Sequence, residues 1–206
     1  MKLRAWAFLT VLVAMPFVSA GGAPLYQAGQ HHSSVVHNLL HGEISAGYQF
    51  SNAFLQDYDG QSDSSHLRGA GVRALWSPLP WLSAGAEYTR LGKVDLEQAW
   101  VSSYTLSRTG AVVKLTLSPD TNPRLYLLGG FGRSEHHLQF SKMFSSHKKS
   151  QTYWTAGLGV ECSVYKAVFA AVEATMHWEK AVYIHPLYKL SSHAQTELQL
   201  RAGVRF

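Results

Sequence analysis

The sequence has only one cysteine, Cys162, among its 206 residues. A single cysteine excludes a disulfide bond within the chain. A lone thiol is unusual in an exported protein, and we expect Cys162 to be a small side chain buried in the protein wall, with no chemical role.

Long apolar segments are missing after the first twenty residues. No later stretch has the length of a membrane-spanning helix, which excludes a helical inner-membrane protein. The formal net charge of +5 is too small to indicate a nucleic-acid partner. Aromatic residues make up 12% of the chain and glycine occurs 17 times, a mixture that is typical of a transmembrane β-barrel, where alternation dilutes the apolar residues.

The N-terminus has the features of a secretory signal peptide. Lys2 and Arg4 precede the almost wholly apolar segment 5–18, and small residues around Ala20 offer a cleavage site. We therefore expect residues 1–20 to be removed on export, which lowers the formal charge from +5 to +3 through the loss of Lys2 and Arg4. A periplasmic lead at 21–41 and a single domain at 42–206 would follow.

The last ten residues alternate strictly in polarity. The apolar parity holds Leu198, Leu200, Ala202, Val204 and Phe206, and the polar parity holds Glu197, Gln199, Arg201, Gly203 and Arg205. A period of two predicts a β-strand with one apolar and one charged face. Such a strand, ending on an aromatic residue, suits the wall of a barrel with hydrocarbon outside and a polar lumen inside.

The same period recurs and predicts eight strands in all. Their approximate bounds are 43–50, 69–76, 82–89, 108–117, 124–133, 153–161, 168–177 and 197–206. The fifth strand is ambiguous, because large apolar residues occur on both of its parities. Turns rich in proline at 77–80 and 118–123 are short. The connections after the odd-numbered strands, at 53–66, 91–103, 134–150 and 178–193, are long and polar, which is the asymmetry of outer-membrane barrels.

A soluble barrel such as a lipocalin would show the same alternation, with its apolar parity inside. The signal peptide, the terminal Phe206 and aromatic residues near strand ends favour the membrane. Those aromatic residues are Tyr48, Phe50, Trp76, Tyr88, Trp100, Trp154 and Trp178. We therefore predict an all-β fold, an eight-stranded antiparallel up-and-down barrel that crosses the outer membrane of a Gram-negative cell.

From about Gly42 to Phe206 the chain resembles the small eight-stranded outer-membrane barrels of the OmpA, OmpX and opacity-protein type. The resemblance is carried by Trp76-Ser77-Pro78 at a turn, by the segment 153–160 with its two glycines, and by the terminal segment 201–206. It implies that outer-membrane lipid and lipopolysaccharide surround the wall. It also implies that the barrel-assembly machinery recognises the last strand through Leu200, Ala202, Val204 and Phe206.

The polar faces of the predicted strands carry charges of both signs. The charged side chains expected in the lumen are Glu43, Arg73, Glu87, Arg108, Lys114, Glu161, Glu173, Glu197, Arg201 and Arg205. Because eight strands enclose an interior just wide enough for side chains, opposite charges there should pair. We interpret them as an ionic plug that holds the barrel shut, and a narrow gated conduit for ions is the alternative.

The connection 134–150 is basic and partly apolar. Its candidate binding residues are His136, His137, Lys142, Lys148 and Lys149. Cations there suit lipopolysaccharide phosphates, sulfated glycans or a host surface protein, and an ordinary solvated loop tip is the alternative. The spacing of the eleven histidines forms no recognisable metal site. We expect neither a metal nor a cofactor.

Enzymes also occur among small outer-membrane barrels. The lipid A deacylase family uses a histidine with a serine two residues later, whereas His177 is followed by Trp178 and Glu179. We therefore expect a non-catalytic barrel that stabilises the envelope and presents external loops for adhesion or for resistance to host defence. An ion channel is the first alternative, and a lipid A-modifying enzyme is the second.

Overall fold

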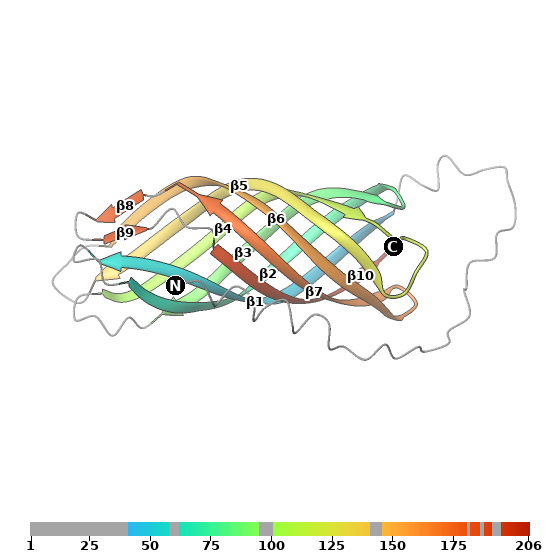
Figure 1. Cartoon of the computed structure of the whole chain (residues 1–206), viewed down its shortest axis with the longest axis horizontal. Coiled ribbons are helices and arrows are strands. Elements are labelled where there is room, and N and C mark those ends of the chain that lie inside the picture. The colour runs from blue at the N-terminus through green and yellow to red at the C-terminus, as the bar shows by residue number, and fades with distance from the viewer. Residues whose placement is uncertain are drawn as a thin grey trace, which may run out of the picture. The chain divides into compact units, whose positions relative to one another are not determined.

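The computed structural model describes residues 41–57, 62–94, 101–140, 146–180, 182–185, 188–190 and 195–206. Eight long antiparallel strands close into a barrel (Figure 1). These strands are β1 (Gly42–Asp57), β2 (Ser62–Leu79), β3 (Leu82–Val94), β4 (Val101–Thr116), β5 (Arg124–Phe140), β6 (His147–Tyr165), β7 (Val168–Glu179) and β10 (Gln195–Arg205). The predicted fold class is confirmed. The predicted signal peptide and nearly all of the periplasmic lead lie outside the described residues.

Two shorter strands lie between β7 and β10. They are β8 (Val182–His185) and β9 (Tyr188–Leu190), which pair with each other, and β9 also pairs with Leu55–Asp57 of β1. Nowhere in the described ranges is there a helix with the length and apolar character needed to span a membrane.

The barrel closes where β1 pairs with β10. The register runs from Glu43 opposite Arg205 to Ser51 opposite Glu197. Beyond the ladder, the Gly42 amide donates to the Phe206 carbonyl at 2.9 Å, and the Phe206 amide donates to the Gly42 carbonyl at 3.0 Å. Within the lipid-facing wall no strand is left with a free edge, as hydrocarbon requires.

The two ends of the barrel differ. Tight connections at 80–81, 117–123 and 166–167 lie at one end, which we name the turn end. In Figure 1 β1 starts and β10 finishes at this end, on the right, whereas β8 and β9 lie at the opposite end, which we name the loop end. The predicted turn 77–80 begins three residues too early, and of its residues only Pro80 lies in the turn. β2 continues through a bulge to Leu79, so that Pro80 and Trp81 form the turn.

Side chains divide by parity between the outside and the lumen. In β5, Leu125 and Leu127 are about half exposed on the outside, whereas Tyr126 and Leu128 are buried inside, which resolves the ambiguity of this strand. Cys162 has the outward parity of β6 and is exposed. The expectation of a buried thiol was therefore wrong, because its parity is that of the lipid-facing residues.

The strands extend much farther toward the loop end than the sequence predicted. β5 and β6 take up most of the predicted connection 134–150, and β1 and β2 take up most of 53–66. The reason is a reversal of polarity along the wall. In β5 the outward residues change from Leu127 and Phe131 to Arg133 and Glu135, whereas the inward residue Leu138 is fully buried. The strands therefore stay paired beyond the level at which their outward residues stop being apolar.

On one side, the extended part of the barrel has an apolar interior. The inward residues of this side, which we name the apolar layer, are all fully buried: Leu67, Leu91, Tyr104, Leu106 and Leu138. They are contributed by four adjacent strands, with Leu91 opposite Leu106 and Tyr104 opposite Leu138. Water outside and apolar side chains inside is the arrangement of a soluble barrel, so the two halves of the wall have opposite polarity.

The interior is packed closely enough for a single methyl group to matter. A Cβ added at Gly159 would lie 2.4–2.6 Å from the phenol of the buried Tyr126. We expect Gly159→Ala to lower the free energy of unfolding by about 1–3 kcal/mol through overpacking. Gly129→Ala is the control, since no atom lies within 4 Å of its added Cβ. Urea titration of the detergent-refolded barrel measures both, and equal midpoints would contradict the expectation.

Candidate functional site

Arg73 is the centre of a charged cluster deep in the lumen. Its Nε donates to Glu87 Oε2 at 2.5 Å, and its two Nη atoms donate to the carboxylate of Glu173 at 2.7 and 3.0 Å. The Tyr126 hydroxyl donates to the same carboxylate at 2.7 Å, and Arg201 Nη1 reaches Glu87 at 3.4 Å. One guanidinium therefore ties together β2, β3 and β7.

Lys114 forms a second cluster nearer the turn end. Its Nζ lies 2.8 Å from Glu43 Oε2 and 2.8 Å from Glu161 Oε2. Arg205 Nη2 lies 2.5 Å from Glu161 Oε1. The ammonium also lies 4.7 Å from the centre of the Tyr126 ring, a distance at which a cation is attracted to the face of the ring.

The two clusters together form the turn-side network, which holds four carboxylates and four cations. Its members are Glu43, Glu87, Glu161, Glu173, Arg73, Lys114, Arg201 and Arg205. All are buried except Arg205, whose side chain is 23% exposed. A balanced set avoids the large free-energy cost of an unpaired charge in a dry interior.

A loop-side network surrounds Arg108. Its guanidinium pairs with Glu197 and, at 3.2 Å, with Glu179 Oε1, and it donates to Gln195 at 2.5 Å. Each carboxylate also has a histidine partner: His136 Nε2 lies 3.0 Å from Glu179, and His177 Nε2 lies 3.1 Å from Glu197.

Neutral side chains connect the two networks. Thr175 Oγ1 lies 3.2 Å from His177 Nε2 and accepts from Gln199 Nε2 at 3.4 Å. Gln199 Oε1 in turn accepts from Arg201 Nη1 at 2.9 Å. Polar contacts therefore run continuously along the lumen, from the loop-side network to the turn-side network.

All ten charged residues predicted to face the lumen lie in these two networks, and each has a partner of opposite charge. Their role as a plug stays a prediction. The outward residues Leu200, Ala202, Val204 and Phe206 of the predicted assembly signal are exposed on the lipid-facing side of the last strand.

The candidate binding residues of the predicted loop 134–150 lie in different places in the structure. His136 is no loop residue: it lies in β5, is 1% exposed, and contacts Glu179 inside the barrel. Its parity is that of the inward residues, and the strand continues past it. His137 is half-buried, and Lys148 and Lys149 are exposed near the start of β6. Lys142 lies outside the described residues.

Sequence reasoning missed Glu179 and Tyr104. Glu179 was assigned to a loop, yet it continues the inward parity of Glu173, Thr175 and His177 in β7, so one more step of the same period would have found it. Tyr104 lies between the predicted connection 91–103 and the predicted strand 108–117, and its hydroxyl is 2.6 Å from His136 Nδ1. Its alternation with Leu106, on the parity of Arg108, is the signal that would have extended the strand to it.

The loop-side network does not have the geometry of a nucleophile and its base. Ser134 Oγ lies 3.2 Å from His136 Nε2, but Glu179 contacts that same nitrogen and Tyr104 holds the other one. A catalytic triad needs the serine and the carboxylate on opposite ring nitrogens. Among the described residues no group of three or more histidine, cysteine or acidic side chains could hold a metal ion.

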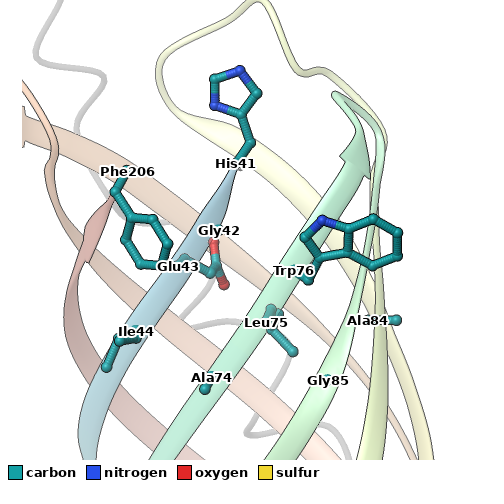
Figure 2. A pocket seen from close by; sticks show the side chains of 10 residues that line it. All are labelled: His41, Gly42, Glu43, Ile44, Ala74, Leu75, Trp76, Ala84, Gly85 and Phe206. Carbon is teal, nitrogen blue, oxygen red and sulfur yellow. The ribbon is translucent and has the colours of Figure 1, made fainter. Parts of the chain in front are cut away.

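A shallow apolar groove lies on the wall at the turn end, beside the closure. Figure 2 shows Ala74 and Trp76 on one strand, Ala84 and Gly85 on the next, and the Phe206 ring on the other side of β1. A Cβ added at Gly42 would lie 2.9 Å from the Phe206 ring. The terminal aromatic side chain therefore packs against the first residue of β1, where the barrel closes.

The comparisons with known proteins agree with this architecture. The family model described as "Outer membrane protein beta-barrel domain" matches residues 12–206. The solved structure of Ail, the attachment invasion locus protein of Yersinia pestis, is 18% identical with a TM-score of 0.54, over 81% of this chain and 98% of that chain. Neisserial surface protein A is 16% identical with a TM-score of 0.60, over 80% and 97% of the two chains. At these identities the likeness concerns the fold alone. No curated protein matches the sequence.

The pairing of Arg108 with two carboxylates generates a stability prediction. Arg108→Met would leave Glu179 and Glu197 buried without their cation, and we expect a loss of about 3–5 kcal/mol in the free energy of unfolding. Adding Glu179→Gln and Glu197→Gln should restore most of this loss, since the charges are then removed together. Arg133→Met, on the exposed face, is the control. The free energy of unfolding in urea is measured for the wild type, Arg108→Met, the triple variant and Arg133→Met. The folded fraction at each urea concentration is determined from the difference in gel migration between folded and boiled protein. A loss no larger than that of the control would refute the pairing argument.

Proposed function

Because the chain belongs to the outer membrane protein β-barrel family, we propose that it is a non-catalytic envelope protein whose loop end faces the outside and binds an external partner. Export through a cleaved signal peptide and assembly through the C-terminal strand are parts of this proposal. The single observation that carries it is the filled interior. Buried side chains occupy the described part of the lumen, so we place ligand binding on the outer surface.

Buried side chains fill the described part of the lumen. The turn-side and loop-side networks hold buried, paired charges, and the apolar layer lies beside the loop-side network, with Leu106 opposite His136. Cross-strand contacts of this density make the barrel a rigid support. A rigid support lowers the entropy cost of binding at its rim, which favours a role in recognition.

The exposed rim of β6 supports an anionic partner. Lys148 and Lys149 are exposed, and Lys148 pairs in register with His137 of β5. Sulfated glycans and phosphorylated surfaces suit such a cluster, since lysine acts as a compact positive charge. A structure of Ail, 18% identical with a TM-score of 0.55, is a complex with the heparin analogue sucrose octasulfate. That molecule is a suitable first probe, and adhesion to a host surface is the biological role we propose.

The proposed rim site makes a direct prediction. We expect Lys148→Gln/Lys149→Gln to weaken binding of sucrose octasulfate about tenfold at low salt, because two charges facing the ligand are lost. The control is Arg90→Gln/Arg133→Gln, which removes the same charge from the side of the wall. Isothermal titration of the detergent-solubilised barrel measures the affinity. Equal weakening by the two double variants would argue against a rim site.

A channel is the second candidate, and one observation favours it. Gln49 Oε1 and Arg201 Nη2 are buried without a hydrogen-bond partner among the described residues, so the lumen has polar positions where water would bind. The apolar layer argues against conduction, because the side chains of Leu67, Leu91, Leu106 and Leu138 offer no polar group to a passing ion.

Planar bilayer recordings separate these two functions. We expect no steady conductance from the reconstituted wild-type barrel, and none from Arg73→Gln/Glu87→Gln, since the loop-side network and the apolar layer still fill the lumen in this variant. Heat-modified gel migration controls for folding. A steady wild-type current that changes in the double variant would favour the channel.

The lipid A-modifying alternative has less support. His177 lies inside the barrel at 4% exposure and contacts Glu197 and Thr175. A lipid substrate lies against the outside of the wall, which this imidazole does not face.

A further inference from the structure

The outward face of the wall changes from aromatic to cationic at one level. In the three strands that run toward the loop end and carry this pattern, an exposed aromatic residue is followed two positions later by an exposed cation. The pairs are Tyr88 and Arg90 in β3, Phe131 and Arg133 in β5, and Trp178 and Lys180 after β7. Arg68 of β2, also exposed, lies opposite Phe50 of β1 in the ladder.

The aromatic residues mark the edge of the hydrocarbon on the loop side. Phe131, Trp154 and Trp178 are neighbours in register across β5, β6 and β7, and the Phe131 and Trp154 ring centres are 5.6 Å apart. Aromatic side chains gather at the level of the lipid headgroups. The cations one step beyond therefore lie among the headgroups of the outer leaflet.

A shallow polar depression lies within this cationic level. Tyr88, Ser107, Thr109, Arg133 and Glu135 line it. The register arranges the site as two rows across β3, β4 and β5. Arg90, Ser107 and Glu135 form the row nearer the loop end, and Tyr88, Thr109 and Arg133 form the row nearer the membrane.

Two arginines therefore occupy opposite corners of this surface, with two hydroxyl groups between them. Adjacent strands are about 4.8 Å apart and residues two positions apart are separated by about 7 Å along a strand, so both guanidinium groups can reach a single ligand. Arg133 Nε also donates to Ser150 Oγ of β6, on the side of β5 away from Arg90, and the rest of its guanidinium is left for a ligand.

We propose that this surface binds the phosphorylated sugar headgroup of lipid A. Arginine forms paired hydrogen bonds with phosphate, the exposed Tyr88 ring offers a flat apolar face to a sugar, and the Glu135 carboxylate accepts hydrogen bonds from sugar hydroxyls. The arginines project sideways from the wall at the headgroup level, which suits a lipid of the same leaflet better than a ligand approaching the rim. The inference rests on the proposed placement of the loop end outside the cell, and it is separate from the rim site at Lys148 and Lys149.

Binding of purified lipid A to the whole barrel tests the proposal. We expect Arg90→Gln/Arg133→Gln to weaken binding of bis-phosphorylated lipid A about tenfold or more, because charge-assisted hydrogen bonds to phosphate are lost. The matched control Lys148→Gln/Lys149→Gln, with the same change of charge, should alter it less than about twofold. Monophosphoryl lipid A should bind the wild type more weakly than the bis-phosphorylated form.

The failures of the two proposed sites are distinguishable. Loss of lipid A binding in the lysine variant alone, or equal binding by all three proteins, would overturn the lipid A site. Loss of sucrose octasulfate binding in the arginine variant alone would also overturn it, since the surface would then be a general sulfate site. None of these measurements depends on the rim site being correct.

A second measurement does not remove the arginines. Ser107→Cys in a Cys162→Ala background places a spin label between the two rows. In nanodiscs, bis-phosphorylated lipid A should immobilise this label, whereas phosphatidylglycerol at the same charge density should not. Equal immobilisation by both lipids would contradict recognition of a phosphorylated sugar.

Discussion

Closure of β1 on β10 is the constraint on which the rest of the barrel depends. In hydrocarbon an unpaired amide or carbonyl costs several kcal/mol, so the first and last strands must meet along their lipid-facing length. The register from Glu43 opposite Arg205 to Ser51 opposite Glu197 meets this requirement. Once the ring is closed, each wall residue faces either the lumen or the outside, and the charged side chains of the lumen are almost wholly buried.

The interior networks follow from that division. Buried ion pairs are seldom more stabilising than apolar side chains of the same size, so stability alone does not explain a charged lumen. A chain with apolar residues on both faces of its strands would instead contain long apolar segments. Such segments are typical of membrane-spanning helices and of strands that aggregate. Polar residues on the lumen face keep the exported chain free of long apolar segments. Each buried charge then needs a partner of opposite sign, and Arg73, Arg108 and Lys114 each contact two carboxylates.

The sequence was sufficient for the fold class, the strand count and the inward set of charges, because a period of two assigns faces wherever one side of the wall is lipid. The sequence was insufficient where the outward and inward residues no longer differ in the way that a lipid-facing wall requires. Beyond Phe131 the outward residues of β5 become polar, so the period faded and His136 was assigned to a loop instead of the interior. The partners within the networks were also out of reach. Arg108 and Glu197 are 89 positions apart in the sequence and meet only across the lumen. Which side chains can meet in this way depends on the diameter of the closed barrel.

The reversal of polarity also decides what each cation in the wall does. Inside, the Arg108 side chain is 2% exposed, and its charge is paired with carboxylates from β7 and β10, across the lumen. Outside, Arg90 and Arg133 lie at the level where the solvent changes from hydrocarbon to headgroups. Desolvation there is partial, so a cation persists without a protein carboxylate, and its hydrogen-bonding capacity is left for a phosphate of the surrounding leaflet. Farther out, Lys148 and Lys149 are surrounded by water and are screened by salt within about 8 Å. Their interactions are correspondingly weaker and more easily exchanged. A permanent lipid contact therefore suits the wall arginines, and a reversible contact with another surface suits the rim lysines.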